Sequence, residues 1–131
     1  MSPQEIIALY VALNLILAPI LMVRVGQVRM SEKVSLGDGG NKVVISRMRA
    51  HANFTENAPL ALIGLIALAG LGAASIALHI FGAAFTFGRV AHAHGMAAKN
   101  GEGVGRVIGA MLTLLTFVGI AGYLLYLIFA G

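Results

Sequence analysis

The residues best suited to do chemistry lie in one short stretch, RMRAHANFTENAP, which runs from Arg47 to Pro59. Within it Arg49, Asn53 and Glu56 follow the i, i+4, i+7 spacing that places side chains on one face of an α-helix. A guanidinium, an amide and a carboxylate on one face suit a zwitterionic ligand that carries both carboxylates and an amine. The stretch continues directly into LALIGLIALAG, so this polar face borders an apolar segment.

A second one-sided polar set lies in FTFGRVAHAHGM, where Arg89, His92 and Met96 share a helix face. His94 points elsewhere, so the two histidines do not form a metal pair and we predict no metal site. Glu56 needs a partner, because a charge at membrane depth costs about 2.5–3.5 kcal/mol. Arg49 is two turns away on the same helix, so Arg89 on another helix is the better predicted partner.

Structural interpretations of these residues remain open. Arg47 is favoured as an interfacial anchor, and Asn53 alone could join two helices. A Glu56–Arg89 pair could equally be a structural staple or part of a binding site. His79, in the middle of an apolar segment, is favoured as a packing or interface residue rather than a ligand-binding one.

The composition predicts an all-α integral membrane protein. The 131 residues are 59% hydrophobic and 11% charged, and the mean hydropathy is +0.91. A soluble domain of this size cannot bury so much apolar surface. Basic residues are few and not interleaved with aromatic ones, which excludes a nucleic-acid-binding face. The chain has no cysteine, so disulfides and a thiolate of its own are excluded.

Three uncharged segments define the membrane spans, and the turn GLGAAS divides the longest into a helical hairpin. We therefore predict one domain, a four-helix bundle with helices at about 5–24, 42–70, 74–97 and 104–130. The N-terminal segment is interpreted as a retained span rather than a signal peptide. Two loop regions contain the basic residues, whereas both termini and the hairpin turn have none. By the positive-inside rule both loops face the cytoplasm and both termini lie outside.

These motifs resemble a known family. RMRAHANFTENAPLALI is similar to the helix-two signature Arg-Ala-x-x-Asn-x-x-Glu-x-x-Pro of the membrane-associated proteins in eicosanoid and glutathione metabolism, the MAPEG proteins. FTFGRVAHAHGM and GRVIGAMLT resemble the family's helix-three motif and the start of its helix four. The GDGG turn is similar to that of the small bacterial branch, and the resemblance covers nearly the whole chain.

The resemblance implies a homotrimer in the bacterial inner membrane, with a cytoplasmic-side site between subunits that binds glutathione as co-substrate. Arg49, Asn53 and Glu56 would then contact glutathione, with Arg89 as a supporting charge. His92 is included among the glutathione-binding residues, although it and Met96 replace two tyrosines of the leukotriene-forming members. Asn57 likewise stands where family enzymes commonly have tyrosine.

The implied activity is that of a glutathione S-transferase or peroxidase acting on hydrophobic electrophiles or lipid hydroperoxides. A guanidinium near the thiol would favour the thiolate. Arg106, at the start of the last helix, or Arg29, after the first, is predicted for this role, with Lys99 as another candidate. The resemblance also implies that an arginine after the first helix, Arg24 or Arg29, reaches the ligand. The alternative function is a non-catalytic lipid-binding or scaffold trimer. The expected partners are further copies of the chain, membrane lipid and a hydrophobic small molecule.

Overall fold

The computed structural model describes residues 1–98 and 101–130, and these residues form four α-helices and no strand. The helices are α1 (Pro3–Ser31), α2 (Lys42–Gly70), α3 (Ser75–Ala97) and α4 (Val104–Phe129). Each is long and apolar enough to cross a membrane, which confirms the predicted all-α membrane bundle.

The predicted bounds of α2, α3 and α4 agree with the structure to within one residue, whereas the predicted end of α1 was wrong. α1 continues to Ser31 instead of ending near residue 24. The apolar run fixes how much of a helix lies in lipid, but charged residues such as Arg24 and Arg29 are good helix formers outside it. The helix stops only where Lys33 takes a positive φ of 57°.

Local capping explains where the first two helices begin. Ser2 and Glu5 form a capping box at the start of α1. Asn41 caps α2, because its side-chain oxygen accepts hydrogen bonds from the backbone N–H groups of Val43 and Val44. The Gly39–Gly40 turn before it has positive φ at both glycines, so the chain can reverse there.

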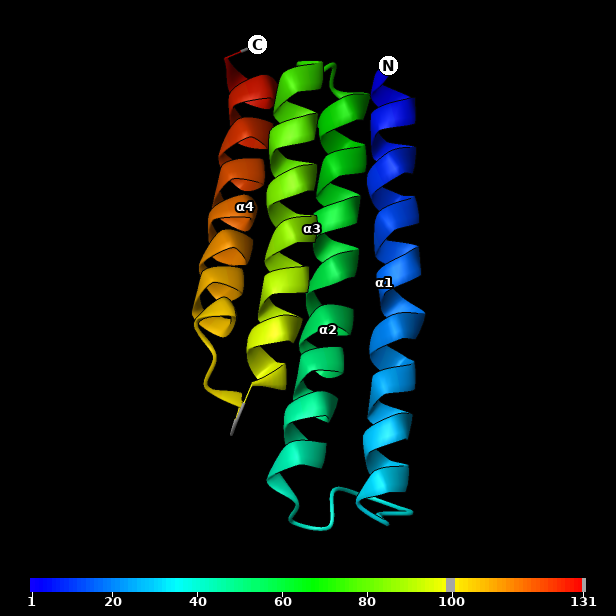
Figure 1. Ribbon diagram of the computed structural model, residues 1–131. Coiled ribbons are helices and arrows are strands. Elements are labelled where there is room, and N and C mark those ends of the chain that lie inside the picture. The colour runs from blue at the N-terminus through cyan, green and yellow to red at the C-terminus, as the bar shows by residue number, and fades with distance from the viewer. Residues whose placement is uncertain (99–100, 131) are drawn as a thin grey trace.

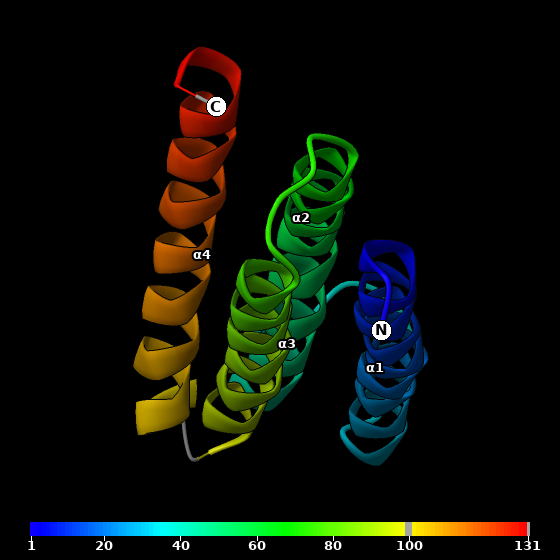
Figure 2. The same ribbon diagram turned by 90° about the horizontal axis from the view of Figure 1, so that it is seen from above.

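The helices run side by side in alternating directions, so both termini and the α2–α3 turn lie at one end and the other two loops at the opposite end (Figure 1). Figure 2 shows α1 and α4 at opposite sides of the molecule, with α2 and α3 between them. The most extensive packing joins α3 to α4 and α1 to α2. The chain is therefore an open bundle, and all four helices expose large apolar side chains.

Two buried apolar clusters hold the helices together. One, near the termini, contains Ile6, Tyr10, Leu65, Leu68, Ala73, Leu78 and Ile120. The other, nearer the opposite end, contains Leu21, Phe54, Ala58, Ala61, Phe85 and Ala93. The polar groups of the site lie beyond the second cluster, at the end of the bundle where the α1–α2 and α3–α4 connections are found (Figure 1).

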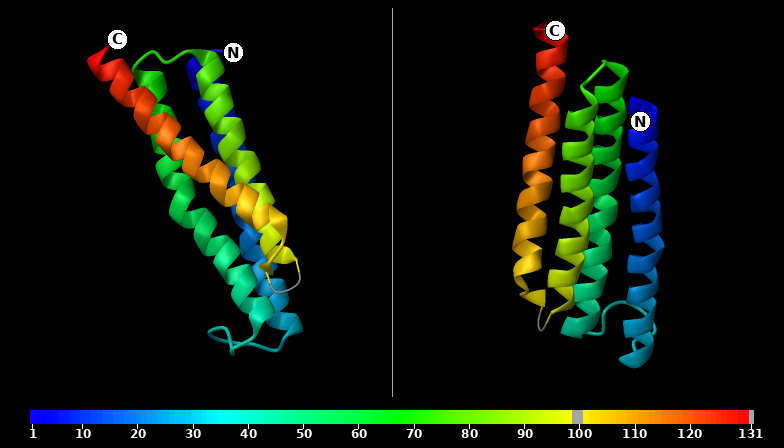
Figure 3. Two further views of the ribbon diagram at one scale, coloured as in Figure 1. Left: turned by 90° about the vertical axis from the view of Figure 1, so that its left-hand side faces the viewer. Right: turned by 45° about the horizontal axis from the view of Figure 1, so that its top comes forward.

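Glycines bring the backbones of α3 and α4 into contact at this end. A Cβ on Gly95 would lie 2.0 Å from the backbone nitrogen of Arg106, and one on Gly109 would lie 2.3 Å from the carbonyl oxygen of Gly88. Figure 3 (left) shows the two helices close together where they are joined and diverging towards the C-terminus. This close approach lets side chains of α3 reach the backbone of α4.

Candidate functional site

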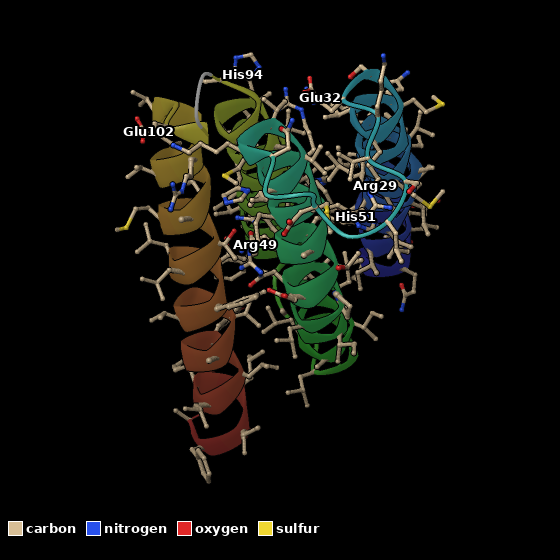
Figure 4. The ribbon with its side chains drawn as sticks, turned by 90° about the horizontal axis from the view of Figure 1, so that it is seen from below. Arg29, Glu32, Arg49, His51, His94 and Glu102 are labelled. Carbon is tan, nitrogen blue, oxygen red and sulfur yellow. The ribbon has the colours of Figure 1, made fainter. Side chains whose placement is uncertain are left out.

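A pocket of about 360 Å³ lies between α2, α3 and the start of α4. We call it the basic pocket; it is lined by Lys42, Ile45, Ser46, Arg49, Asn53, His92, Met96, Gly101 and Arg106. Figure 4 shows Arg49 on the side of α2 that faces α4, whereas His51 lies on the side towards α1. The one-turn spacing of Arg49 and Asn53 thus places both in the same pocket.

The charge of the basic pocket is one-sided. Lys42, Arg49 and Arg106 bring three cationic side chains, and none of the described residues that line it is aspartate or glutamate. A pocket with such walls favours ligands with carboxylate or phosphate groups, because guanidinium and ammonium groups bind anionic oxygens through charge-assisted hydrogen bonds.

Arg89 lies beside this pocket and is almost fully buried, with 2% of its surface exposed. Its Nη1 donates a hydrogen bond to Oδ1 of Asn53, and its Nη2 donates to the carbonyl oxygen of Gly109, at 2.8 Å, and to Oγ1 of Thr113. The guanidinium also lies 5.8 Å from the centre of the Phe85 ring. Arg89 therefore joins α2, α3 and α4 through neutral groups.

The end of α3 is held by two residues at the start of α2. Oγ of Ser46 and Nη1 of Arg47 both donate to the carbonyl oxygen of Met96, and Nη2 of Arg47 donates to that of Ala97 at 3.2 Å. These bonds satisfy carbonyl groups that have no partner within a helix end. They fix the wall of the basic pocket that α3 provides.

Comparison with known proteins identifies the family. The sequence profile of the MAPEG family matches residues 7–126. The chain belongs to the MAPEG family. It is 33% identical, over 88 residues and 67% of each chain, to the inner membrane protein YecN of Escherichia coli K12, and equally to YecN of the O6:H1 strain CFT073. No solved structure matches the chain significantly. The relatives and the four spanning helices support an integral inner-membrane protein.

Four of the seven residues predicted for the MAPEG site line the basic pocket, namely Arg49, Asn53, His92 and Arg106. Arg89 lies in the layer behind it, where it lines a smaller hollow with Asn53 and Asn57. Of the alternatives for the thiol-activating charge, Lys99 lies outside the described residues. Helical periodicity predicted that Arg49 and Asn53 share a face of α2 and that His92 lies on a polar face of α3, whereas Arg106 was predicted from the resemblance.

The predicted pairing of Glu56 with Arg89 was wrong, because the two side chains do not pair within a single chain. Glu56 is exposed and does not line the basic pocket, and Asn53 takes the place of its carboxylate as the acceptor on α2. Phe54 and Ala58, on either side of Glu56, are buried against the neighbouring helices. Side chains two residues apart on a helix point in different directions, so Glu56 faces outward.

Arg29 also lies outside the basic pocket of its own chain. It stands near the end of α1, where its Nη2 donates to the carbonyl oxygen of Gly37, and it lines a separate hollow with Lys33 and Val34. Figure 4 shows it on α1, with α2 between it and Arg49. A role for Arg29 in the MAPEG site therefore requires a second copy of the chain.

Sequence reasoning missed the part that Ser46 and Thr113 play in building the site. Arg47 was interpreted as an anchor at the membrane surface, whereas the structure gives it the capping role at α3. The sequence carries no signal for this role, because Arg47 lies near the start of α2 and the carbonyls that it bonds end a different helix. Asn57 bonds the backbone oxygen of Asn53 on its own helix, at 2.6 Å.

His79 is hydrogen-bonded within the bundle, away from the basic pocket. Nδ1 of His79 lies 3.0 Å from the hydroxyl group of Tyr10, which confirms its interpretation as a satisfied packing residue. His92 is buried and His94 exposed, so the two do not converge. Among the residues that the structure describes, no three histidine or acidic side chains come together as metal ligands would.

Proposed function

We propose that this MAPEG protein binds glutathione in the basic pocket and uses it as a glutathione S-transferase or peroxidase. The observation that carries the proposal is the convergence of Arg49, Arg106 and Asn53 from α2 and α4 on one pocket at the basic end of the bundle. Glutathione has two carboxylates and a thiol, so a pocket rich in cations and hydrogen-bond donors is complementary to it.

Arg106 is the residue that we propose for stabilising the thiolate. It lies at the start of α4, and among its described hydrogen bonds is one to the carbonyl oxygen of Gly101 at 3.5 Å, so guanidinium donors remain for a ligand. A neighbouring positive charge lowers the pKa of a thiol and raises the fraction of thiolate at neutral pH. The thiolate would then attack a carbon of an apolar electrophile, forming a carbon–sulfur bond as the bond to the leaving group breaks and the leaving group departs as an anion. With a lipid hydroperoxide it would attack the terminal oxygen, breaking the O–O bond, so that glutathione becomes the sulfenic acid and the alkoxide takes up a proton to leave as the alcohol.

We further propose that the working form is a homotrimer in which a neighbouring subunit completes the pocket. Glu56 and Arg29 both lie outside the pocket of their own chain, and the open bundle exposes apolar faces on α1 and α4. A neighbouring copy would cover such faces and could bring either residue to the ligand. Mass measurement of the protein in detergent tests the stoichiometry.

Calorimetric titration of the detergent-solubilised protein with glutathione tests the proposal. Saturable binding is expected, together with a thiolate absorbance band that appears when glutathione is added. Arg49→Gln should weaken binding at least about tenfold, because it removes a charge-assisted hydrogen bond. Lys33→Gln removes one positive charge from an exposed residue at the same end and should leave the affinity unchanged. Absence of binding by the unaltered protein would exclude the proposal.

A second candidate is non-catalytic binding of anionic lipid headgroups. The observation that favours it is the absence of acidic residues among the described residues that line the basic pocket, since a phosphate group needs no acidic partner whereas the amine of glutathione does. This candidate predicts anionic lipid that co-purifies with the protein and is lost in Arg49→Gln. It also predicts no conjugation or peroxide reduction.

A further inference from the structure

Asn53 connects two hollows of the site. It lines the basic pocket together with Arg49 and Arg106, and it also lines the smaller hollow that contains Arg89. Arg89 does not line the basic pocket. We propose that Arg89 acts through Asn53 as a positioning residue, fixing the side-chain amide so that its NH₂ group faces the ligand and this position accepts only a hydrogen-bond acceptor.

The orientation of the amide follows from the chemistry of its partner. A guanidinium group has only donors, so the amide atom that faces Arg89 must be the oxygen. Nη1 of Arg89 donates to Oδ1 of Asn53, and Nδ2 of Asn53 is then turned to the other side of the amide. The two ends of an asparagine amide look alike by shape alone, and here the hydrogen-bond partner distinguishes them.

Arg89 is itself held in one position. Its Nη2 donates to Gly109 and Thr113 of α4, and its side chain is buried. The close approach at Gly109 makes the first bond possible, because a Cβ there would lie 2.5 Å from Cβ of His92. Rotation of the Asn53 amide would place its NH₂ group against a fixed guanidinium, with two donors facing each other.

Nδ2 of Asn53 is therefore available to a ligand. Among the described residues, its amide makes its side-chain hydrogen bond through Oδ1 to Arg89, and the bond from Asn57 reaches only its backbone oxygen. Given the proposed function, Asn53 donates to a carboxylate of glutathione rather than to its amine. Asn53 thus determines specificity, and Arg89 enforces it from a position behind the pocket.

A double-mutant cycle with glutathione as the probe tests whether Arg89 acts through Asn53. Asn53→Ala and Arg89→Met should each weaken binding about tenfold, the loss expected for a hydrogen bond to a charged group. In the Asn53→Ala background, Arg89→Met should add no more than about a twofold loss, because the side chain that it positions is gone. Additive losses would overturn the proposal, since they would mean that the charge of Arg89 acts on the ligand directly.

Asn53→Asp tests the contact between residue 53 and Arg89 without requiring a ligand. An aspartate keeps the oxygen that accepts from Arg89 and adds a charge, so the apparent melting temperature should rise by about 3 °C or more. The same variant presents an oxygen to the pocket, and its glutathione binding should be lost. Movement of stability and binding in opposite directions would not result from a merely structural role.

The outcomes of this variant separate the two proposals. A lower melting temperature for Asn53→Asp would mean that residue 53 does not meet the guanidinium of Arg89, and unchanged glutathione affinity would mean that Nδ2 does not contact the ligand; either result overturns the inference. If the unaltered protein binds no glutathione, the proposed function falls. The melting temperature would then still decide whether Arg89 contacts the side chain at position 53.

Discussion

Arg89 carries its charge inside the bundle with neutral groups as its hydrogen-bond acceptors. A buried charge is costly unless its hydrogen-bonding capacity is met. The carbonyl of Gly109, the hydroxyl of Thr113 and the amide oxygen of Asn53 accept hydrogen bonds from its two terminal nitrogens, and the face of Phe85 lies near the guanidinium, whereas Nε has no acceptor among the described residues. Each of these groups is therefore part of the support of the pocket, although only Asn53 lines it.

The hydroxyl group of Thr113 should matter for stability. Thr113→Val keeps the shape of the side chain but removes an acceptor from buried Arg89, and we expect the free energy of unfolding to fall by about 1–3 kcal/mol. Thr116→Val is the matched control, because Thr116 is equally buried in α4 but bonds only Leu112 of its own helix among the described residues. Thermal unfolding in detergent measures both. Equal effects would show that Arg89 does not depend on Thr113.

For individual residues, the sequence predicted which polar side chains lie near the pocket better than it predicted which of them bond to each other. Helical periodicity placed Arg49 and Asn53 on one face, and the structure brings both to the pocket. It could not decide whether Asn53 or Glu56 meets Arg89, because that depends on how α2 is rotated about its axis against α3. The rotation is set by the packing of Phe54 and Ala58, which spacing alone does not reveal.

The packing of α3 on α4 is the element-scale feature on which the site depends. Arg106 reaches the basic pocket from the first turn of α4, and its backbone nitrogen lies where a Cβ of residue 95 would stand. The contact between α3 and α4 thus also positions a wall of the pocket.

Gly95→Ala should consequently damage both stability and binding. Its methyl group would meet backbone atoms, which cannot move aside as a flexible side chain can, so we expect a loss of about 2–3 kcal/mol in unfolding free energy. Displacement of Arg106 should weaken glutathione binding in the same variant. Gly122→Ala, also in a long helix but with nothing within 4 Å of the added Cβ, should be neutral or more stable. If both variants unfold alike, the backbones of α3 and α4 do not make the contact described.

The helices themselves could be predicted because uncharged runs and turn residues mark them directly. Gly105 and Gly109 have a spacing that lets helices approach closely, but a chain with 17 glycines offers many such pairs. Selecting the true one requires the crossing of the two helices. The end of α1 could not be predicted for another reason: its final turns lie beyond the apolar run and so carry no hydropathy signal.

At the scale of the whole molecule, the positions of the loops predict which end of the bundle faces the cytoplasm. Both basic loops lie at one end and both termini at the other (Figure 1). We expect the basic end to face the cytoplasm. Because the chain has no cysteine, single cysteines can report this without background labelling. In spheroplasts an impermeant maleimide should label Leu71→Cys, in the α2–α3 turn, and not Ser35→Cys, in the α1–α2 loop. The reverse pattern would contradict the predicted orientation.

The helices differ in length, and this shapes access to the pocket. α1 and α2 have 29 residues each, whereas α3 has 23. At 1.5 Å per residue, α2 is about 9 Å longer than α3, and its first turns extend past the end of α3 (Figure 1). The pocket, lined by Lys42 at the start of α2, therefore opens onto a step at this end of the bundle. With this end in water, the proposed glutathione would arrive from the aqueous side without crossing lipid, while the proposed apolar co-substrate would approach sideways through the bilayer, so two reactants that share no solvent would meet there.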